Sequence, residues 1–150
     1  MDKILGKYSG VIYSAFRIVG GLLFVQHGVQ NLFGGLGGIR PNGGAAAFLS
    51  VLFFAGLIEF FGGLLIAVGF QTSWAAFLAS GQMAVAYWWK LAPLSMFPIV
   101  NRGEIAVLYC FSFLYIASHG GGKYSLDAIF RKSAKLEADK TPRDFSAGLD

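Results

Sequence analysis

Residues 48–91 read FLSVLFFAGLIEFFGGLLIAVGFQTSWAAFLASGQMAVAYWWKL, and this stretch decides the fold. It contains two apolar runs, Phe48–Phe70 and Ser73–Leu91. Each run is close to the roughly 20 residues that a helix needs to cross a lipid bilayer. Only Gln71 and Thr72 separate the two runs. A connection this short forces neighbouring helices to run antiparallel, so the stretch predicts a helical hairpin.

Two further apolar runs flank the hairpin, at Ser9–Val29 and Asn101–Ser118. The chain of 150 residues is 55% apolar and only 13% charged, whereas soluble domains average about 25% charged residues. A soluble protein of this composition would have helices with almost no polar face. The sequence therefore predicts an all-α protein in which residues 1–122 form a four-helix transmembrane bundle.

Residues 123–150 are expected to form a basic cytoplasmic tail with a short amphipathic helix. Ser125 stands where it could cap that helix, and Leu126, Ile129 and Phe130 would share one of its faces. A helix of this kind can lie on an anionic membrane leaflet. An ordinary solvated tail accounts for the composition equally well.

The basic residues predict the orientation of the chain in the membrane. An even number of spans places both termini on one side, and basic residues concentrate on the cytoplasmic side of membrane proteins. We therefore expect a multi-pass protein of the bacterial inner membrane with cytoplasmic N- and C-termini. The formal net charge of +4 is explained by this topology, and nucleic acid is not an expected partner. The terminal side carries Lys3, Lys7, Lys123, Arg131, Lys132, Lys135, Lys140 and Arg143, and the opposite side carries Arg40, Lys90 and Arg102.

Two ionisable residues, Arg17 and Glu59, lie inside apolar runs. Each would cost at least about 2.5 kcal/mol if it faced lipid at the centre of a helix, so both are expected to face protein or water. Counted at 1.5 Å per residue from the cytoplasmic ends of the runs, Arg17, Gln82 and Glu59 lie at depths of about 12, 13 and 16 Å. We therefore expect a buried ion pair between Arg17 and Glu59, with Gln82 as a hydrogen-bonding neighbour.

A second polar layer is expected nearer the outer surface. His27 lies close to the outer end of the first run, and Asn101 and Glu104 open the fourth run at the same end. An imidazole and a carboxylate that meet there would form a pair that responds to pH. Glu104 is also explained simply by its place in the first turn of a helix, where an acidic side chain complements the helix dipole.

Glycines on the first two runs are expected to let the helices pack closely, although the same glycines could leave room for a flat ligand. Cys110 is the single cysteine of the chain, so an internal disulfide is excluded. No motif with metal-ligand spacing occurs, so no metal site is expected and no catalytic residue is assigned. The packing glycines are Gly20, Gly21, Gly28, Gly62 and Gly63.

Several of these motifs, taken in order over about residues 10–130, resemble the DoxX family of small four-helix membrane proteins. Members of that family often have lysine where this chain has Asn31 and glycine where it has Arg102, so an anion contact from such a lysine is not expected here. The matching segments are Arg17 with Gly20-Gly21, His27-Gly28 with Leu32-Phe33-Gly34, Glu59 with Gly62-Gly63 and Gly69, Asn101-Arg102-Gly103-Glu104-Ile105-Ala106 with Leu108-Tyr109, and Gly120-Gly121-Gly122-Lys123-Tyr124-Ser125-Leu126-Asp127.

The resemblance implies an integral membrane subunit associated with a quinone-linked oxidoreductase, because the family is similar to the membrane subunit of a thiosulfate:quinone oxidoreductase. Quinone is then the expected ligand, and no intrinsic cofactor is expected. The alternative is a non-catalytic scaffold or accessory subunit of a larger respiratory or photosynthetic complex, and a small transporter is a third hypothesis. The expected partners are the lipid bilayer and subunits of such a complex, and assembly as a homo-oligomer stays open.

Overall fold

The first long helix opens the structure, a computed structural model that describes residues 5–41 and 43–140. A short 3-10 turn, Gly6–Tyr8, leads into α2, Ser9–Phe33. The helix ends at Gly34, whose φ of 67° is a left-handed conformation that glycine adopts without steric cost. Together the turn and α2 are long and apolar enough to cross a membrane.

The second long helix is one continuous rod of three segments. Helix α3, Val51–Leu57, passes into the π-helical segment η2, Ile58–Gly62, and then into α4, Gly63–Val68. A π-helical segment inserts an extra residue into an α-helix, and such segments often occur at functional sites. This rod is the second stretch that is long and apolar enough to cross a membrane.

The remaining helices complete the bundle and its ends. Helix α5, Thr72–Ala86, continues into a second π-helical segment, η3, Tyr87–Leu91. The short helix α6, Pro98–Asn101, precedes α7, Glu104–His119, which is apolar but shorter than the first two rods. Helix α8 spans Leu126–Lys140.

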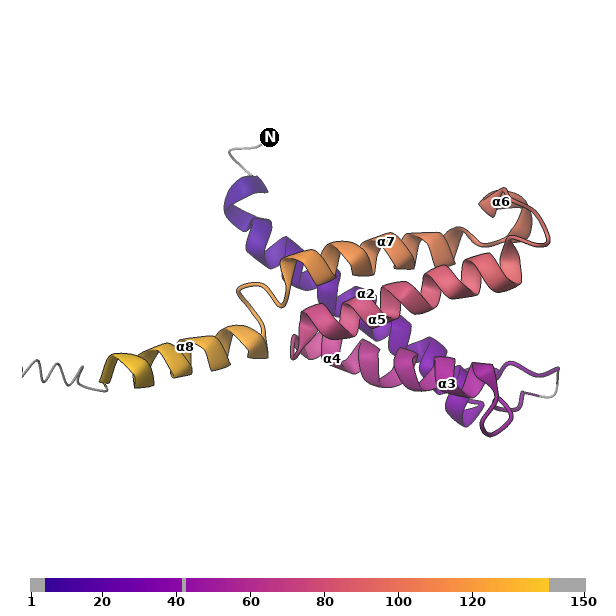
Figure 1. Cartoon of the computed structure of the whole chain (residues 1–150), viewed down its shortest axis with the longest axis horizontal. Helices are drawn as coiled ribbons and strands as arrows, with labels where there is room; N and C mark the ends of the chain where they lie inside the picture. Colours follow the sequence, from indigo (N-terminus) through magenta and orange to yellow (C-terminus); the bar gives the residue numbers. More distant parts are fainter. Residues whose placement is uncertain (1–4, 42, 141–150) are drawn as a thin grey trace, which may run out of the picture.

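The long helices pack as two pairs, α2 along the rod α3–η2–α4 and α5 along α7. Figure 1 shows α2 crossing the other helices obliquely, with its first turns projecting beyond them. The start of α2 and helix α8 lie at one end of the bundle, and the loop after α2 and helix α6 lie at the other. We call these the terminal end and the loop end.

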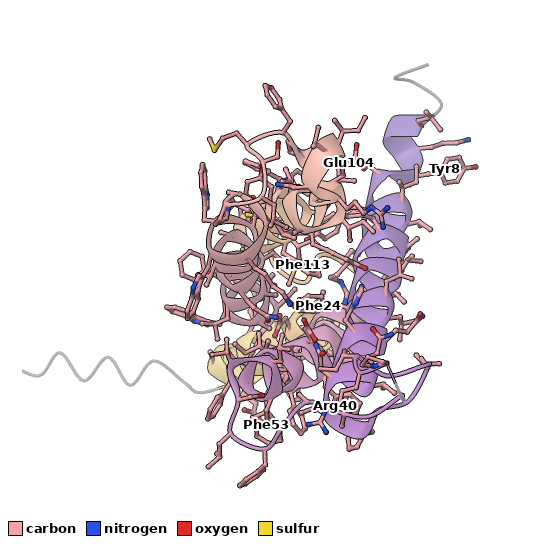
Figure 2. All side chains as sticks on the ribbon, turned by 90° about the vertical axis from the view of Figure 1, so that its right-hand side faces the viewer. Tyr8, Phe24, Arg40, Phe53, Glu104 and Phe113 are labelled. Atoms are coloured by element: carbon pink, nitrogen blue, oxygen red, sulfur yellow. The ribbon has the colours of Figure 1, made fainter. Side chains whose placement is uncertain are left out.

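The apolar core lies where the two pairs meet. Phe24 and Phe113 are fully buried there, with ring centroids 4.7 Å apart (Figure 2). Three buried alanines on α5 allow α7 to approach closely, and the hydroxyl of Ser80 donates a 2.8 Å hydrogen bond to the carbonyl of Cys110 on α7. The buried core consists of Phe24, Ile66, Ala75, Ala76, Ala79, Met83, Phe113 and Ile116.

The all-α prediction is confirmed, because the described residues are helical and contain no strand. The predicted C-terminal helix is α8, and the hydroxyl of Ser125 caps it by accepting a 3.1 Å hydrogen bond from the N–H of Ala128. Helix α8 runs away from the bundle (Figure 1). Residues 141–150 of the expected tail lie outside the described residues.

Candidate functional site

The carboxylate of Glu59 lies at the centre of a buried polar network that joins three helices. Only 6% of Glu59 is exposed. Its Oε2 accepts a hydrogen bond of 2.5 Å from Nδ2 of Asn31 on α2, and its Oε1 accepts one of 2.9 Å from Nε2 of Gln82 on α5. A carboxylate can only accept hydrogen bonds, so both amides turn their NH2 groups towards it. The network therefore stabilises a negative charge within the bundle.

A groove of about 480 Å³ lies beside this network, between the second rod and α5. Glu59 and Gln82 line it together with apolar side chains of α3 and α5, and Trp89 and Lys90 line it towards the loop end. Both π-helical segments contribute to its wall, since Glu59 lies in η2 and Trp89 in η3. An apolar cleft with a few convergent polar groups is the usual form of a small-molecule site.

Gln82 leaves one polar atom of this network without a partner. Its Oε1 is buried and makes no hydrogen bond, because its NH2 group is turned towards Glu59. An unpaired buried acceptor costs about 1–3 kcal/mol, so proteins seldom keep one without a reason. A hydrogen-bond donor that reached Gln82 from the groove would remove that cost.

Arg17 does not form the expected ion pair with Glu59. Its guanidinium is fully buried and donates to the backbone carbonyl oxygens of Ile66 and Ala67, the latter at 2.7 Å, and to that of Tyr124 at 2.8 Å. Ile66 and Ala67 lie in the last turn of α4, where carbonyls lack partners within the helix. Arg17 therefore closes the C-terminal end of α4, which carries the negative end of the helix dipole.

The register of the two helices explains why Arg17 and Glu59 are separated. A Cβ on Gly21 would lie 2.7 Å from backbone atoms of Gly63 and Ala67, so α2 and α4 touch there. This contact places Arg17 against Gly69, ten residues beyond Glu59 and roughly 15 Å further along a helix. The prediction aligned the two helices by the ends of their apolar runs. In the structure Arg17, eight residues into α2, instead lies beside Gly69, just past the end of α4.

The segment that follows α7 returns to the bundle and fastens the turn between α4 and α5. The carboxylate of Asp127 accepts hydrogen bonds from the N–H of Gln71 at 2.9 Å, and from the N–H and hydroxyl of Thr72 at 3.0 and 2.7 Å. The N–H of Asp127 donates to the carbonyl of Gly69 at 2.9 Å. Together with the Arg17–Tyr124 contact, these bonds form what we call the terminal clamp.

The terminal clamp also sets the ionisation of Asp127. Partial burial by itself would raise the pKa of this carboxyl group. The hydrogen bonds from Thr72 and Gln71, with the nearby charge of Arg131, outweigh that effect and hold the pKa below its ordinary value. The most specific motif of the sequence, residues 120–127, is thus a structural connection in the fold.

The expected outer layer of His27, Glu104 and Asn101 is not brought together. His27 packs edge-on against the ring of Tyr109, with centroids 5.9 Å apart, and lies within electrostatic range of Glu59. Glu104 is exposed at the start of α7. Asn101 organises the preceding turn, because its Nδ2 donates to a backbone carbonyl at 2.7 Å and its Oδ1 accepts from the N–H of Gly103 at 2.7 Å.

The five expected packing glycines fall into two groups. A Cβ added to Gly21, Gly28 or Gly63 would come within 2.7 Å of a neighbouring backbone atom, so these positions set the distance between α2 and the second rod. A Cβ on Gly20 or Gly62 would meet only one side-chain atom, at 3.9 and 3.8 Å respectively. Close packing therefore does not require glycine at these two positions.

Sequence reasoning missed Asn31 as the partner of Glu59. The signal was present, because Asn31 shares a face of the first helix with Arg17 and Gly28. Which residue of that face lies beside Glu59 depends on the register of the two helices, and the sequence did not give that register. In the described part of the chain, no three His, Cys, Asp or Glu side chains lie close enough to hold a metal ion.

Comparison with known proteins adds the family. The sequence model of the DoxX family matches residues 12–91, which contain most of α2, the second rod and α5 with η3. An uncharacterized protein of Haemophilus influenzae is 35% identical over 138 residues, which is 85% of this chain and 97% of that relative. No solved structure matches the chain. These matches show that the chain belongs to the DoxX family of membrane proteins.

Proposed function

We propose that the chain is the membrane subunit of a quinone-linked oxidoreductase and binds a quinone in the groove beside Glu59. The observation that carries the proposal is the groove itself, an apolar slot lined by the buried residue Glu59 and by Gln82, whose buried amide oxygen is unpaired. A quinone ring needs an apolar slot reached from the bilayer and polar groups for its two oxygens. The subunit that exchanges electrons with the quinone would be a separate partner.

The polar groups of the groove suit the reduced form of such a ligand. A quinol hydroxyl can donate to the unpaired Oε1 of Gln82, which a quinone carbonyl cannot do. The carboxyl group of Glu59 accepts hydrogen bonds from Asn31 and Gln82, and in its ionised form it would receive a proton that the ligand releases. Lys90, which also lines the groove, offers a donor towards the loop end.

The proposal includes the topology expected from the sequence. All four long helices would cross the bacterial inner membrane, with the terminal end in the cytoplasm. In support, the start of α2 and helix α8 lie at the same end of the bundle (Figure 1). The apolar side chains on the outside of all four helices support it too, for example Leu22, Phe61, Phe77 and Phe111, each exposed by 48% or more.

A titration with a short-chain quinol and the matching quinone tests the ligand. The protein is placed in lipid nanodiscs, and binding is measured by the quenching of tryptophan fluorescence. Ala55→Phe narrows the groove and should weaken binding at least tenfold, whereas Val68→Phe changes the same rod outside the groove and should not. Absence of saturable binding of either form to the unaltered protein would refute the proposed function.

One observation favours the alternative, an accessory subunit that helps a larger complex to assemble. Helix α8 extends away from the bundle and exposes Ile129, Phe130 and Leu136 by 55% or more. Deletion of α8 from Arg131 onwards leaves the terminal clamp in place. This deletion distinguishes a role in quinol binding from a role in assembly of a complex. Loss of co-purifying subunits with unchanged quinol binding would support the assembly role.

A further inference from the structure

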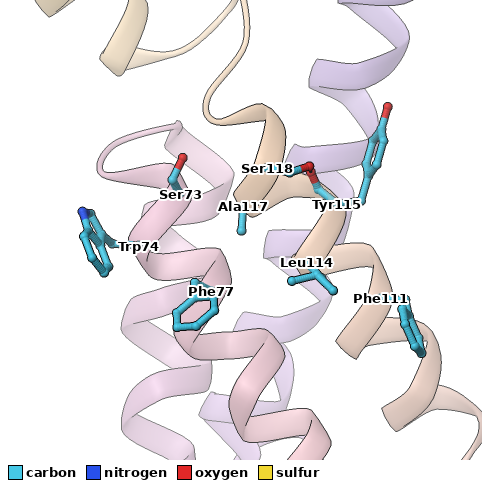
Figure 3. Close-up of a pocket in the computed structure, with 8 residues that line it drawn as sticks. All are labelled: Ser73, Trp74, Phe77, Phe111, Leu114, Tyr115, Ala117 and Ser118. Atoms are coloured by element: carbon cyan, nitrogen blue, oxygen red, sulfur yellow. The ribbon is translucent and has the colours of Figure 1, made fainter.

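A second apolar groove runs between α5 and α7, on a different face from the Glu59 groove. It has a volume of about 660 Å³, and Phe77 of α5 and Leu114 of α7 are among the side chains that line it (Figure 3). Ser73 and Ser118 lie together at one end of this groove (Figure 3). The groove is therefore apolar along the helices and becomes polar towards the terminal end.

The groove continues into a polar chamber of about 500 Å³. Ser73, Trp74 and Ser118 line both cavities, so the two are contiguous. The chamber adds the side chains of His119 and Arg131, at the end of α7 and on α8. Trp74 stands at the junction and is 70% exposed. Tryptophan is enriched where a membrane meets water, so the junction has the composition expected at the level of lipid headgroups.

Arg131 has hydrogen-bond donors to spare, and His119 donates through its Nε2 when its ring is protonated. Arg131 uses only its Nε, which donates to the backbone carbonyl of Asp127 at 3.2 Å. His119 contacts its own helix through Nδ1, at 3.1 Å from the carbonyl of Tyr115. In the part of the chain that is described, the terminal nitrogens of Arg131 and the Nε2 of His119 make no hydrogen bond. An arginine fork of this kind suits the oxygens of a phosphate group.

One carboxylate also lines the chamber, that of Asp127. Its oxygens already accept three hydrogen bonds, from the N–H groups of Gln71 and Thr72 and from the hydroxyl of Thr72. A ring contact beside the clamp holds the start of α8, which carries Arg131, against the bundle, because Phe130 packs edge-on against Phe70 with centroids 5.8 Å apart. The carboxylate is thus occupied in the fold, and the guanidinium is held at the chamber.

We propose that the groove and the chamber together bind one phospholipid from the membrane, with an acyl chain along Phe77 and Leu114 and the phosphate at His119 and Arg131. A phospholipid is the membrane component that combines an apolar chain with a phosphate at the junction that Trp74 marks. A soluble phosphate would leave the apolar groove unfilled. This site is independent of the quinone groove, although it assumes that α5 and α7 lie in the bilayer.

Native mass spectrometry of the detergent-extracted protein with added phosphatidylglycerol tests the headgroup site. We expect the double variant His119→Ala, Arg131→Ala to retain at least fivefold less lipid than the unaltered protein. The matched control is Lys132→Ala, Lys135→Ala, which removes two positive charges from α8 outside the chamber. Equal loss in the control would show general charge attraction to the membrane surface and overturn the proposal.

Two further arms test the groove and the source of the phosphate. Ala117→Phe fills the groove from α7 and should reduce lipid retention, whereas Leu108→Phe lies on α7 outside this groove and should not. Diacylglycerol, which lacks the phosphate, should be retained poorly. Diacylglycerol bound as well as phosphatidylglycerol, or lipid displaced by millimolar inorganic phosphate, would contradict the proposed site. Circular dichroism checks that each variant is folded.

Discussion

Arg17 and Glu59 are both charged and both buried, yet the fold uses them differently. Arg17 donates to backbone carbonyls at the end of α4 and in the segment after α7, so its partners belong to the fold itself. Glu59 accepts from two side-chain amides and borders a groove that a ligand could enter. The partners of a buried charge thus say more about its role than its burial does. Arg17 holds the terminal end together, and Glu59 has the surroundings of a binding group.

The largest effect is expected from removing Arg17. Arg17→Ala leaves the carbonyls of Ile66, Ala67 and Tyr124 without their donor, at about 1–3 kcal/mol for each buried group, so the total should reach several kcal/mol. The thermal unfolding midpoint in nanodiscs measures it. Arg17→Lys keeps the positive charge but loses the planar guanidinium. Its unfolding midpoint should therefore lie between those of Arg17→Ala and the unaltered protein. A midpoint for Arg17→Ala equal to that of the unaltered protein would show that the clamp does not stabilise the fold.

Gly28 offers a smaller test, because it helps to set the register that separates the two charges. A Cβ on Gly28 would lie 2.4 Å from the backbone nitrogen of Phe60, so Gly28→Ala should push the helices apart at about 1–3 kcal/mol. The control is Gly62→Ala, where space exists and alanine favours a helix by up to about 1 kcal/mol. Equal melting midpoints for Gly28→Ala and Gly62→Ala would contradict the observed register between α2 and the second rod.

Asp127 gives a pH-dependent test of the terminal clamp. Its pKa is lower in the folded protein than in the unfolded chain, so its stabilisation is present above the ordinary aspartate pKa of about 4 and is lost as the pH falls through the lower folded value. Asp127→Asn should cost about 1 kcal/mol at neutral pH, as the loss of a helix cap does. It should also flatten the dependence of the melting midpoint on pH below about 4. If the melting midpoint of Asp127→Asn falls with pH just as that of the unaltered protein does, the fall is due to other carboxyl groups and this prediction is wrong.

The smallest effect on stability is expected from Glu59→Gln. The amide of Gln82 can turn over, so that its free Oε1 accepts from the new NH2 group, while Asn31 still donates to the new carbonyl. The melting midpoint should therefore change little. In this turned orientation the Oε1 of Gln82 already accepts from residue 59 and no longer accepts from a quinol hydroxyl. Quinol binding should therefore weaken by up to about tenfold, the loss of one hydrogen bond.

Much of the helical architecture follows from the sequence, because apolar runs of spanning length have few other folds available. The contact of Gln82 with Glu59 was also predictable from helix rise alone, since the short turn at Gln71 fixes the level of the two helices that it joins. The level of α2 was not predictable in this way. Its long connection to α3 leaves the register free, and the close contact at Gly21 and Gly28 sets it.

The two predicted polar layers, Arg17 with Glu59 and His27 with Glu104, were wrong because sequence does not give the register and rotation of the helices. The expected partner of Glu59 was Arg17, and the observed partner is Asn31, nearly four turns further along the same face of α2. His27 and Glu104 share an end of the bundle, but sequence cannot tell which way each side chain faces. The terminal clamp was hidden for a related reason, because hydrogen bonds between Asp127 and a turn more than fifty residues earlier carry no local pattern.

The account rests on Glu59 being a binding group and Arg17 a structural one. The most direct test is the rise in melting midpoint that a saturating short-chain quinol causes in the unaltered protein and in Glu59→Gln, measured in the same nanodiscs. We predict a clear rise for the unaltered protein and a smaller one for the variant, reduced by the roughly 1.4 kcal/mol that tenfold weaker binding costs, with nearly equal midpoints before ligand is added. An equal rise in both proteins, or a variant that is already unfolded without ligand, would contradict the account.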